Sequence, residues 1–313
     1  WAEDAGGWLN PEAADWFERY TTHVAENLGD LVSDWCPINA PNVCLAQGYL
    51  VGGWPPNDVR LTRYLRAART MIEGHIRAYR KIHQVRAAAG YQDTAVGTVL
   101  HLRPFDPKHG TGHERRAAAV YDRLFHEVFV SGLCEGRLLQ PLGSGYPLGE
   151  GRYCDFFGVN YYTRDIVNCT DSPAGPLGRR EVRDGARTND VGWEIYPEGL
   201  YRVCRKYWDR YHIPVFITEN GTADTADHFR SDFIYEHLWQ VHQLIEDGVD
   251  VQRYYHWSLL DGFEWLEGLS AKFGLVAVDP STLERTVRTS GWFYGDIARS
   301  GEVTSKMLRQ YFG

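Results

Sequence analysis

Short apolar segments alternate with segments of helical periodicity along this chain of 313 residues. Apolar residues at helical spacing follow Asn10 and Pro11, and they recur from Leu61 to Tyr79 and from Phe229 to Asp247. This alternation predicts βα units around a parallel sheet, which is the α/β fold class. The apolar segments of strand length lie near residues 31–39, 96–101, 156–162, 214–218 and 251–257.

Several of these predicted strands turn polar or aromatic at their carboxyl ends. Glu219 follows the apolar run of residues 214–217, and Asn39, Tyr162 and Trp257 end three other strands. Right-handed crossovers place the carboxyl ends of parallel strands on one face of the sheet, where such folds carry their chemistry. An isolated Glu at a strand end is usually a surface cap, so the case for Glu219 depends on the residues expected around it.

The number of strands suggests a barrel that is only partly represented. A closed barrel of βα units has eight strands, and five are recognisable here. We therefore predict a (β/α)8 TIM-barrel type with about five of its eight units in this chain. No linker or break in composition divides the sequence, so residues 1–313 are expected to form one domain. Glycines and prolines from Gly48 to Pro56 indicate a long loop after the first strand.

The composition favours a small neutral substrate over a charged macromolecule. The net charge is -8 and no basic stripe is present, which argues against nucleic acid and against an anionic membrane as partners. No apolar run reaches the length of a membrane span. The 11 tryptophans and 19 tyrosines suit core packing and stacking on sugars equally well.

No metal or cofactor is expected. His109 and His113 lie in a predicted loop without carboxylates at ligand spacing. Gly143, Gly145 and Gly149 do not form a phosphate loop in front of a helix. The 6 cysteines show neither C-x-x-C nor zinc spacing, and a chain of this length does not need disulfides. We expect reduced thiols and a cytoplasmic protein.

A set of short motifs resembles glycoside hydrolase family 1, the retaining β-glycosidases. These motifs occur in the family's order, from the first residues to beyond residue 275. The matching segments are Gly6-Gly7-Trp8, Asn10-Pro11, Gly29-Asp30 to Trp35, Asn39-Ala40-Pro41, Gly48-Tyr49, Pro55-Pro56, Asn160-Tyr161-Tyr162, Ile217-Thr218-Glu219-Asn220-Gly221, Trp257-Ser258-Leu259-Leu260-Asp261, Glu264-Trp265 and Phe273-Gly274-Leu275.

The resemblance implies a catalytic nucleophile and a residue that orients it. Glu219 matches the carboxylate that forms a covalent glycosyl-enzyme, which water then hydrolyses. Tyr162 matches the tyrosine whose hydroxyl bonds that nucleophile. The substrate implied is a terminal β-glycoside, either a β-glucoside or a β-galactoside.

The resemblance also implies a set of sugar-binding residues. Asn39 matches a residue that contacts the sugar 2-hydroxyl, and Asn160 belongs to the same group. Trp257 resembles the stacking platform under the sugar ring. Glu264 resembles the bidentate acceptor of the distal hydroxyls, with Trp265 beside it. For the aromatic residues, core packing is the competing interpretation.

One position departs from the family's pattern. Where the family has Thr-x-Asn-Glu-Pro, this chain reads Pro37-Ile38-Asn39-Ala40-Pro41, so Ala40 replaces the general acid/base. Ala40 has no proton to transfer, and losing a general acid typically costs about 10²–10⁴ in rate. We therefore expect impaired or abolished turnover. An engineered substitution is preferred over a natural loss, because Glu219 and the rest of the pocket are retained.

The first three strands of the family's barrel have no counterpart here, because the segment resembling Gly6-Gly7-Trp8 follows the third strand in the family. Five strands alone would leave open sheet edges and an exposed interior. Either a second chain completes the barrel, or the sequence is part of a longer protein, or oligomerisation covers the gap. The alternative function is a non-catalytic β-glycan-binding pseudoenzyme or barrel-completing subunit.

Overall fold

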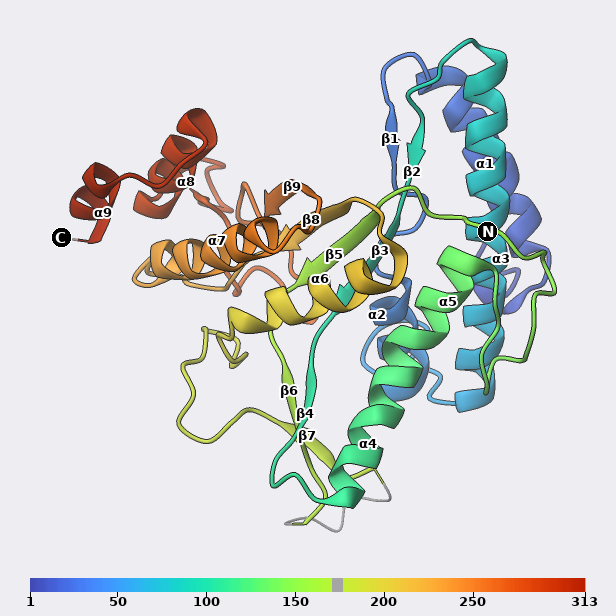
Figure 1. The fold of residues 1–313 in the computed structure, drawn as a ribbon, viewed down its shortest axis with the longest axis horizontal. Coiled ribbons are helices and arrows are strands. Elements are labelled where there is room, and N and C mark those ends of the chain that lie inside the picture. Colours follow the sequence, from blue (N-terminus) through green and yellow to red (C-terminus); the bar gives the residue numbers. More distant parts are fainter. Residues whose placement is uncertain (171–176, 313) are drawn as a thin grey trace. The chain divides into compact units, whose positions relative to one another are not determined.

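The computed structural model describes residues 1–170 and 177–312, and the chain divides into two compact units (Figure 1). Unit 1 comprises Trp1–Leu102, Arg116–Asn160 and Tyr211–Phe216. Unit 2 comprises Arg103–Arg115, Tyr161–Arg210 and Ile217–Gly313.

Two long helices, α1 (Ala13–Leu28) and α3 (Leu61–Ala88), pack side by side in unit 1 (Figure 1). Tyr64, Ala68 and Ile72 recur every four residues on α3 and are fully buried, as expected of an apolar helix face. The helices predicted after Pro11 and from Leu61 are therefore confirmed. The other helices of this unit are η1 (Gly7–Leu9), α2 (Pro41–Ala46), η2 (Gln47–Val51), most of α4 (Gly112–Asp122), η3 (Arg123–Glu127) and α5 (Val128–Glu135).

The strands of unit 1 are β1 (Asp34–Trp35), β2 (Ala95–Val96), β3 (Thr98–Leu102) and, except for its last residue, β5 (Phe157–Tyr161). They are short, and the two longest, β3 and β5, are fully buried. β1 and β2 pair in parallel. Every residue of β3 is buried, as is typical of a parallel strand covered on both faces. Val99 of β3 packs with the stacked rings of Phe156 and Phe216, whose centroids lie 4.1 Å apart.

Unit 2 contains two small sheets in addition to longer elements. β4 (Phe105–Pro107) pairs in parallel with β6 (Asp165–Asn168), and β6 pairs antiparallel with β7 (Arg179–Glu181). β10 (Val276–Val278) and β11 (Arg285–Val287) form an antiparallel pair. The longer elements are α6 (Glu198–Tyr211), β8 (Val215–Asn220), α7 (Arg230–Glu246), β9 (Val251–His256), α8 (Thr289–Ser300) and α9 (Ser305–Phe312), and η4 (Trp265–Glu267) is a single short turn. The last residue of α6 and the first two residues of β8 belong to unit 1.

Strands β5, β8 and β9 lead to predicted site residues, and Asn39 and Ala40 follow the short strand β1. Each of the five segments predicted as strands contains a strand, although the first is reduced to Asp34–Trp35 and an isolated bridge between Asn39 and Val99. Tyr162 directly follows β5, Glu219 lies near the end of β8, and Trp257 directly follows β9.

One prediction about the first unit is wrong in part. The glycines and prolines from Gly48 to Pro56 indicated a long loop, but η2 extends helical backbone through Val51. Pro41 begins the preceding helix α2, where its missing N–H group removes no helical hydrogen bond. The helical backbone that starts at Pro41 continues past Gly48, and Gly52 ends it at a φ of 91°.

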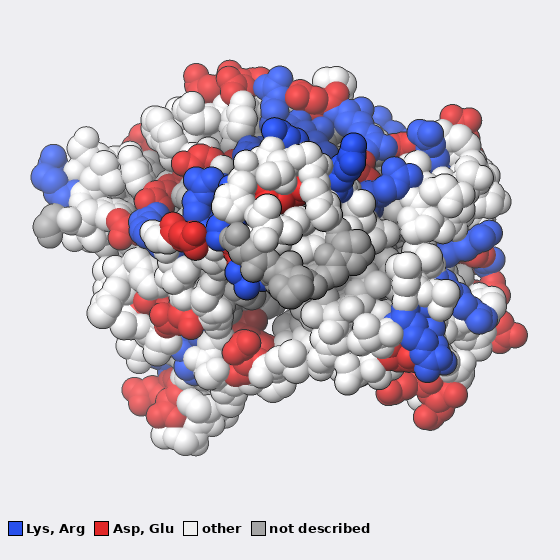
Figure 2. All heavy atoms as spheres, turned by 90° about the horizontal axis from the view of Figure 1, so that it is seen from below, with Lys and Arg blue, Asp and Glu red and all other residues white. Residues whose placement is uncertain are grey.

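Charged residues of both signs lie on the face shown in Figure 2, in keeping with the net charge of -8. Over residues 1–170 and 177–312, no helix is both long enough and apolar enough to cross a membrane.

Candidate active site

Glu219 lies at the end of a buried strand and receives a hydrogen bond from Tyr162. Val215, Phe216 and Ile217 anchor β8 in the interior, and the strand becomes half-buried at Glu219. The hydroxyl of Tyr162 donates to Oε2 of Glu219 at 2.6 Å. Burial, together with the nearby Glu219 carboxylate, raises the pKa of Tyr162. The phenol therefore keeps its proton and acts as a donor to the carboxylate.

Asn220 fixes the backbone beside Glu219. Its side chain is fully buried and donates from Nδ2 to the carbonyl oxygen of Tyr161 at 2.8 Å. The Tyr254 hydroxyl donates to Oδ1 of Asn220 at 2.7 Å. The backbone N–H of Trp257 donates to the backbone carbonyl oxygen of Asn220 at 2.9 Å. The end of β8 is thus bonded on both sides. Asn220 and Tyr254 carry no sequence signal for this role, although Asn220 directly follows Glu219.

The backbone after Glu219 passes very close to Trp257. A Cβ atom at Gly221 would lie 1.8 Å from the carbonyl oxygen of Trp257, which is far inside van der Waals contact. Only glycine fits this approach. Gly221 therefore allows the chain beyond β8 to run next to the end of β9.

Trp257 and Glu264 lie together on the segment after β9. Nε1 of Trp257 donates to Oε1 of Glu264 at 3.2 Å. Burial, with the added charges of Glu219 and Asp261, raises the pKa of Glu264, although the Trp257 hydrogen bond opposes this. Trp265 is exposed at the start of η4 with a φ of 53°. This segment therefore offers an exposed aromatic ring beside a half-buried carboxylate.

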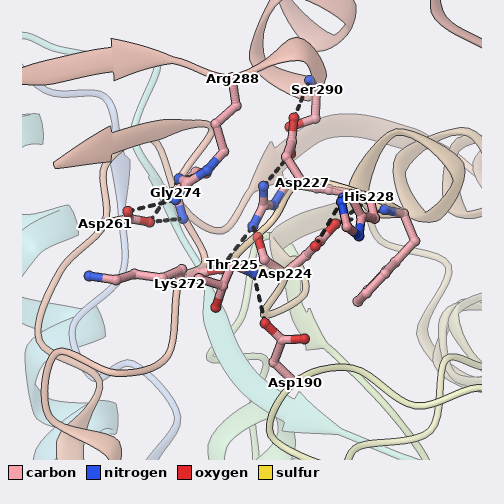
Figure 3. Close-up of polar contacts among 12 residues, drawn as sticks. Asp190, Asp224, Thr225, Asp227, His228, Asp261, Lys272, Gly274, Arg288 and Ser290 are labelled. Carbon is pink, nitrogen blue, oxygen red and sulfur yellow. Dashed lines mark hydrogen bonds and ion pairs between the residues drawn. The ribbon is translucent and has the colours of Figure 1, made fainter.

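An ion pair holds the base of the segment that carries these residues. The Arg288 guanidinium donates to both oxygens of Asp261, at 3.0 and 2.9 Å, and Asp261 also accepts the Gly274 N–H (Figure 3). Burial acts to raise the pKa of Asp261, but the bonds from Arg288 and Gly274 outweigh it and lower that pKa. Asp261 therefore stays ionised and ties both ends of the segment 261–274 to Arg288.

The segment that follows Glu219 is fixed by a second polar cluster. Asp224 accepts backbone N–H bonds from His228, Phe229 and Arg230, and so caps the start of α7 (Figure 3). The buried Arg230 guanidinium donates to the carbonyl oxygens of Asp224 and Lys272. The turns after β8 and β9 are thereby joined by hydrogen bonds.

Unit 1 brings together two of the predicted sugar-binding residues. Nδ2 of the buried Asn160 donates to Oδ1 of Asn39 at 2.9 Å. Ala40 is half-buried, with φ 46° and ψ 50°, and it precedes the first residue of α2. Its N–H donates to the carbonyl oxygen of Val99 at 3.1 Å. A methyl group therefore occupies the position at which the resemblance expects a carboxylate.

Among the residues that the structure describes, no group of three or more His, Cys, Asp and Glu side chains is arranged to hold a metal ion. All six cysteines are free thiols.

The side chains around Glu219 include Tyr162, Trp257 and Glu264. Such residues bind polar, uncharged groups through hydrogen bonds and aromatic stacking.

Comparisons with known proteins identify relatives along almost the whole chain. β-Galactosidase of Sulfolobus acidocaldarius is 35% identical over 311 residues, which cover 96% of this chain and 62% of that protein. β-Glucosidase A of Thermotoga maritima is 32% identical over 322 residues, covering 94% of this chain and 70% of that protein. The chain thus spans 62% of the length of the Sulfolobus enzyme.

Solved structures agree with these relatives. The β-glycosidase from Pyrococcus horikoshii matches with a TM-score of 0.87 and 35% identity, over 99% of this chain and 71% of that chain. The Thermotoga maritima β-glucosidase in complex with glucoimidazole matches with a TM-score of 0.85 and 31% identity, over 96% and 71%. The predicted (β/α)8 TIM-barrel type is thereby confirmed. Since the model of the glycosidase family "Glycosyl hydrolase family 1" matches residues 2–142 and 150–303, this chain belongs to that family.

Proposed function

We propose that this chain is the scaffold of a retaining β-glycosidase that forms a covalent glycosyl-enzyme on Glu219. The observation that carries the proposal is the 2.6 Å hydrogen bond from Tyr162 to Glu219 in a member of this family. The bond occupies one lone pair of Oε2 and fixes the carboxylate, so that one of its oxygens can attack the anomeric carbon of a bound sugar. The proposed substrate is a terminal β-glucoside or β-galactoside, in line with the names of the relatives.

The reaction proceeds in two displacements. In the first, an oxygen of Glu219 bonds to the anomeric carbon, and the bond from that carbon to the leaving oxygen breaks. In the second, water replaces Glu219, releasing the sugar and a proton and restoring the carboxylate. Tyr162 holds the carboxylate during both steps.

The proposed sugar-binding role of each remaining residue follows the family resemblance. Asn39, held by Asn160, contacts the 2-hydroxyl, where hydrogen bonds strengthen in the transition state. Trp257 supports the sugar ring, and its indole N–H orients Glu264. Glu264 accepts bonds from distal hydroxyls, and the exposed Trp265 forms the wall beside it. A half-buried carboxylate binds hydroxyls strongly because little water competes for it.

Ala40 impairs this proposed chemistry at the proton-transfer steps. In the first step Ala40 cannot protonate the departing oxygen, and in the second it cannot remove a proton from the attacking water, so water must serve at both steps. The loss corresponds to a rate decrease of about 10²–10⁴, or about 3–5 kcal/mol of barrier. Substrates with a good leaving group escape the first penalty but not the second. The covalent intermediate is therefore expected to accumulate with such substrates.

Restoring the carboxylate tests the proposed role of this position. Ala40→Glu should raise the hydrolysis of an unactivated β-glucoside by about 10² or more, because both proton transfers return. Ala40→Gln serves as the matched control, since it has similar size but carries no transferable proton. A folded Ala40→Glu protein with the activity of Ala40→Gln would contradict the proposal.

A second candidate function is a non-catalytic β-glycan-binding or barrel-completing subunit. The observation that favours it is the apolar surface after β9, where Leu259, Phe263 and Leu266 are 66%, 70% and 67% exposed. Among the strands that the structure describes, β9 pairs only with β8, so its other edge is open. Such a surface suits another strand and its side chains, supplied by a second chain or by another copy.

Size measurement distinguishes these proposals. A barrel-completing subunit would co-purify with a second polypeptide or self-associate, and its saccharide binding would survive Glu219→Gln. A solitary monomer with measurable turnover would count against this second candidate.

We also propose that residues 1–313 act as one barrel domain in the cytoplasm, and the six free thiols support that location.

A further inference from the structure

Unit 2 has a surface hollow of about 450 Å³ that contains none of the residues assigned to the Glu219 site. One wall is a face of α7, which presents Glu236, Trp239 and Gln240. The lining residues outside α7 come from the segment before α6 and from its first residue, and they are Arg187, Ile195, Pro197 and Glu198. Residues 236 and 240 are one helical turn apart, so their side chains lie on the same face.

The hollow combines an aromatic platform with apolar support. The Trp239 side chain is 52% exposed, and leaving this much indole in water is unfavourable. Ile195 and Pro197 also line the hollow and remain only partly covered. Aliphatic side chains in the same hollow as an indole suit a flat ligand with C–H groups on its faces, which is the form of a pyranose ring.

The polar groups at the rim are of the kind that recognise hydroxyls. Arg187 donates a hydrogen bond to the Glu236 carboxylate, so these two charges offset each other. Gln240 adds an amide, and Glu198 adds a second carboxylate. With two carboxylates and one guanidinium, the rim repels phosphates and nucleotides. Carboxylate, amide and guanidinium groups all bond neighbouring hydroxyls in pairs.

We propose that this hollow is a second saccharide-binding site, which takes a neutral β-linked oligosaccharide with one sugar ring stacked on Trp239. The ligand class rests on the proposed function of the Glu219 site, but binding at Trp239 does not depend on catalysis. The site would hold a second stretch of glycan or an additional chain, and no bond is made or broken there.

Fluorine NMR tests the proposal on the whole chain labelled with 5-fluorotryptophan. The probe is cellotetraose, added to about 10 mM because shallow sugar sites bind weakly. The resonances of Trp239 and Trp257 are assigned from the spectra of Trp239→Phe and Trp257→Phe. The Trp292 resonance, assigned in the same way from the spectrum of Trp292→Phe, is the matched control. Trp292 is 54% exposed on α8 of the same unit and does not line the hollow.

The proposal predicts a saturable shift of the Trp239 resonance and no comparable shift of Trp292. Gln240→Ala should weaken this response about tenfold or more, with an unchanged thermal unfolding midpoint. Cellotetraose that shifts Trp257 but not Trp239 would overturn the second site and leave the Glu219 site intact. A shift of Trp239 without Trp257 would support the second site while counting against the proposed sugar pocket. No shift of either would contradict both.

Discussion

The Tyr162 hydroxyl lies 2.6 Å from Oε2 of Glu219 and donates a hydrogen bond to it. Tyr162 is 8% exposed, so little water competes for this bond. A hydrogen bond to a charged acceptor in such surroundings is worth about 1.5–3 kcal/mol. The contact joins the residue that follows β5 to the end of β8, and the proposed nucleophile depends on it for orientation.

Removal of this hydroxyl should slow the first chemical step. Tyr162→Phe is expected to reduce the rate of glycosylation of Glu219 by about 10–100-fold, because the carboxylate loses its orienting donor. The rate of the dinitrophenolate burst with 2,4-dinitrophenyl β-glucoside measures this step. Tyr255→Phe is the control, since Tyr255 is exposed on β9. Equal burst rates for Tyr162→Phe and the control would show that the contact has no catalytic part.

Asn220 is predicted to matter for stability as well as for the site. Asn220→Ala leaves the Tyr161 carbonyl and the Tyr254 hydroxyl buried without this partner, and each orphaned group costs about 1–3 kcal/mol. Urea unfolding should therefore show a loss of about 2–5 kcal/mol. Asn27→Ala, on the exposed surface of α1, should change stability by less than about 0.5 kcal/mol. Similar losses in the two variants would mean that the bonds of Asn220 are not structural.

Glu264 gives a prediction about pH. Its pKa in the folded protein is raised above 4.5, mainly by burial. As pH rises, the unfolded chain loses this proton first, so the carboxyl makes folding less favourable until the pH exceeds the folded pKa. Glu264→Gln should therefore match the parent near pH 4 and become relatively more stable as the pH increases towards 7.

The matched control for this titration is Glu267→Gln, three residues further along the same segment. Glu267 is exposed on η4, so its replacement should not produce the same pH-dependent difference. Thermal unfolding midpoints across the pH range measure both variants. A parent protein that gains stability relative to Glu264→Gln with rising pH would reverse the predicted sign.

The pair of Arg288 and Asp261 should be costly to break. Their side chains are 10% and 4% exposed, and Arg288→Met leaves the Asp261 charge buried without its cation. Such a loss costs about 3–5 kcal/mol. Arg299→Met removes the exposed ion pair with Asp296 and should cost less than about 1 kcal/mol. Chemical unfolding of the two variants checks the difference, and equal costs would refute a supporting role for the buried pair.

The sequence predicted the main strands because β3, β5 and β8 are rich in β-branched, aliphatic and aromatic residues, with polar residues at or just beyond their carboxyl ends. It did not predict the sheet of β4, β6 and β7 or the pair of β10 and β11. These five strands have three or four residues each, and several are partly exposed, so their sequences show no periodic pattern of apolar residues.

The chemistry around Glu219 was only partly predictable for a different reason. Tyr162, Glu219, Trp257 and Glu264 stand out through local motifs, whereas Asp224, Arg230 and Arg288 act through tertiary contacts with distant segments. No short pattern encodes a bond between Arg230 and the Lys272 carbonyl, 42 residues away. Likewise, the left-handed backbone of Ala40 is unusual for a residue with a Cβ atom and follows from its place between the bridge to Val99 and helix α2.

The covalent intermediate on Glu219 is the central claim, and burst kinetics with 2,4-dinitrophenyl β-glucoside and the β-galactoside analogue test it most directly. We predict a burst close to one dinitrophenolate per chain, slow turnover afterwards, acceleration by azide, and a glycosyl adduct on the peptide containing Glu219. Glu219→Gln should abolish the burst and the adduct. A folded parent protein that shows no burst and no adduct with either substrate would contradict the account.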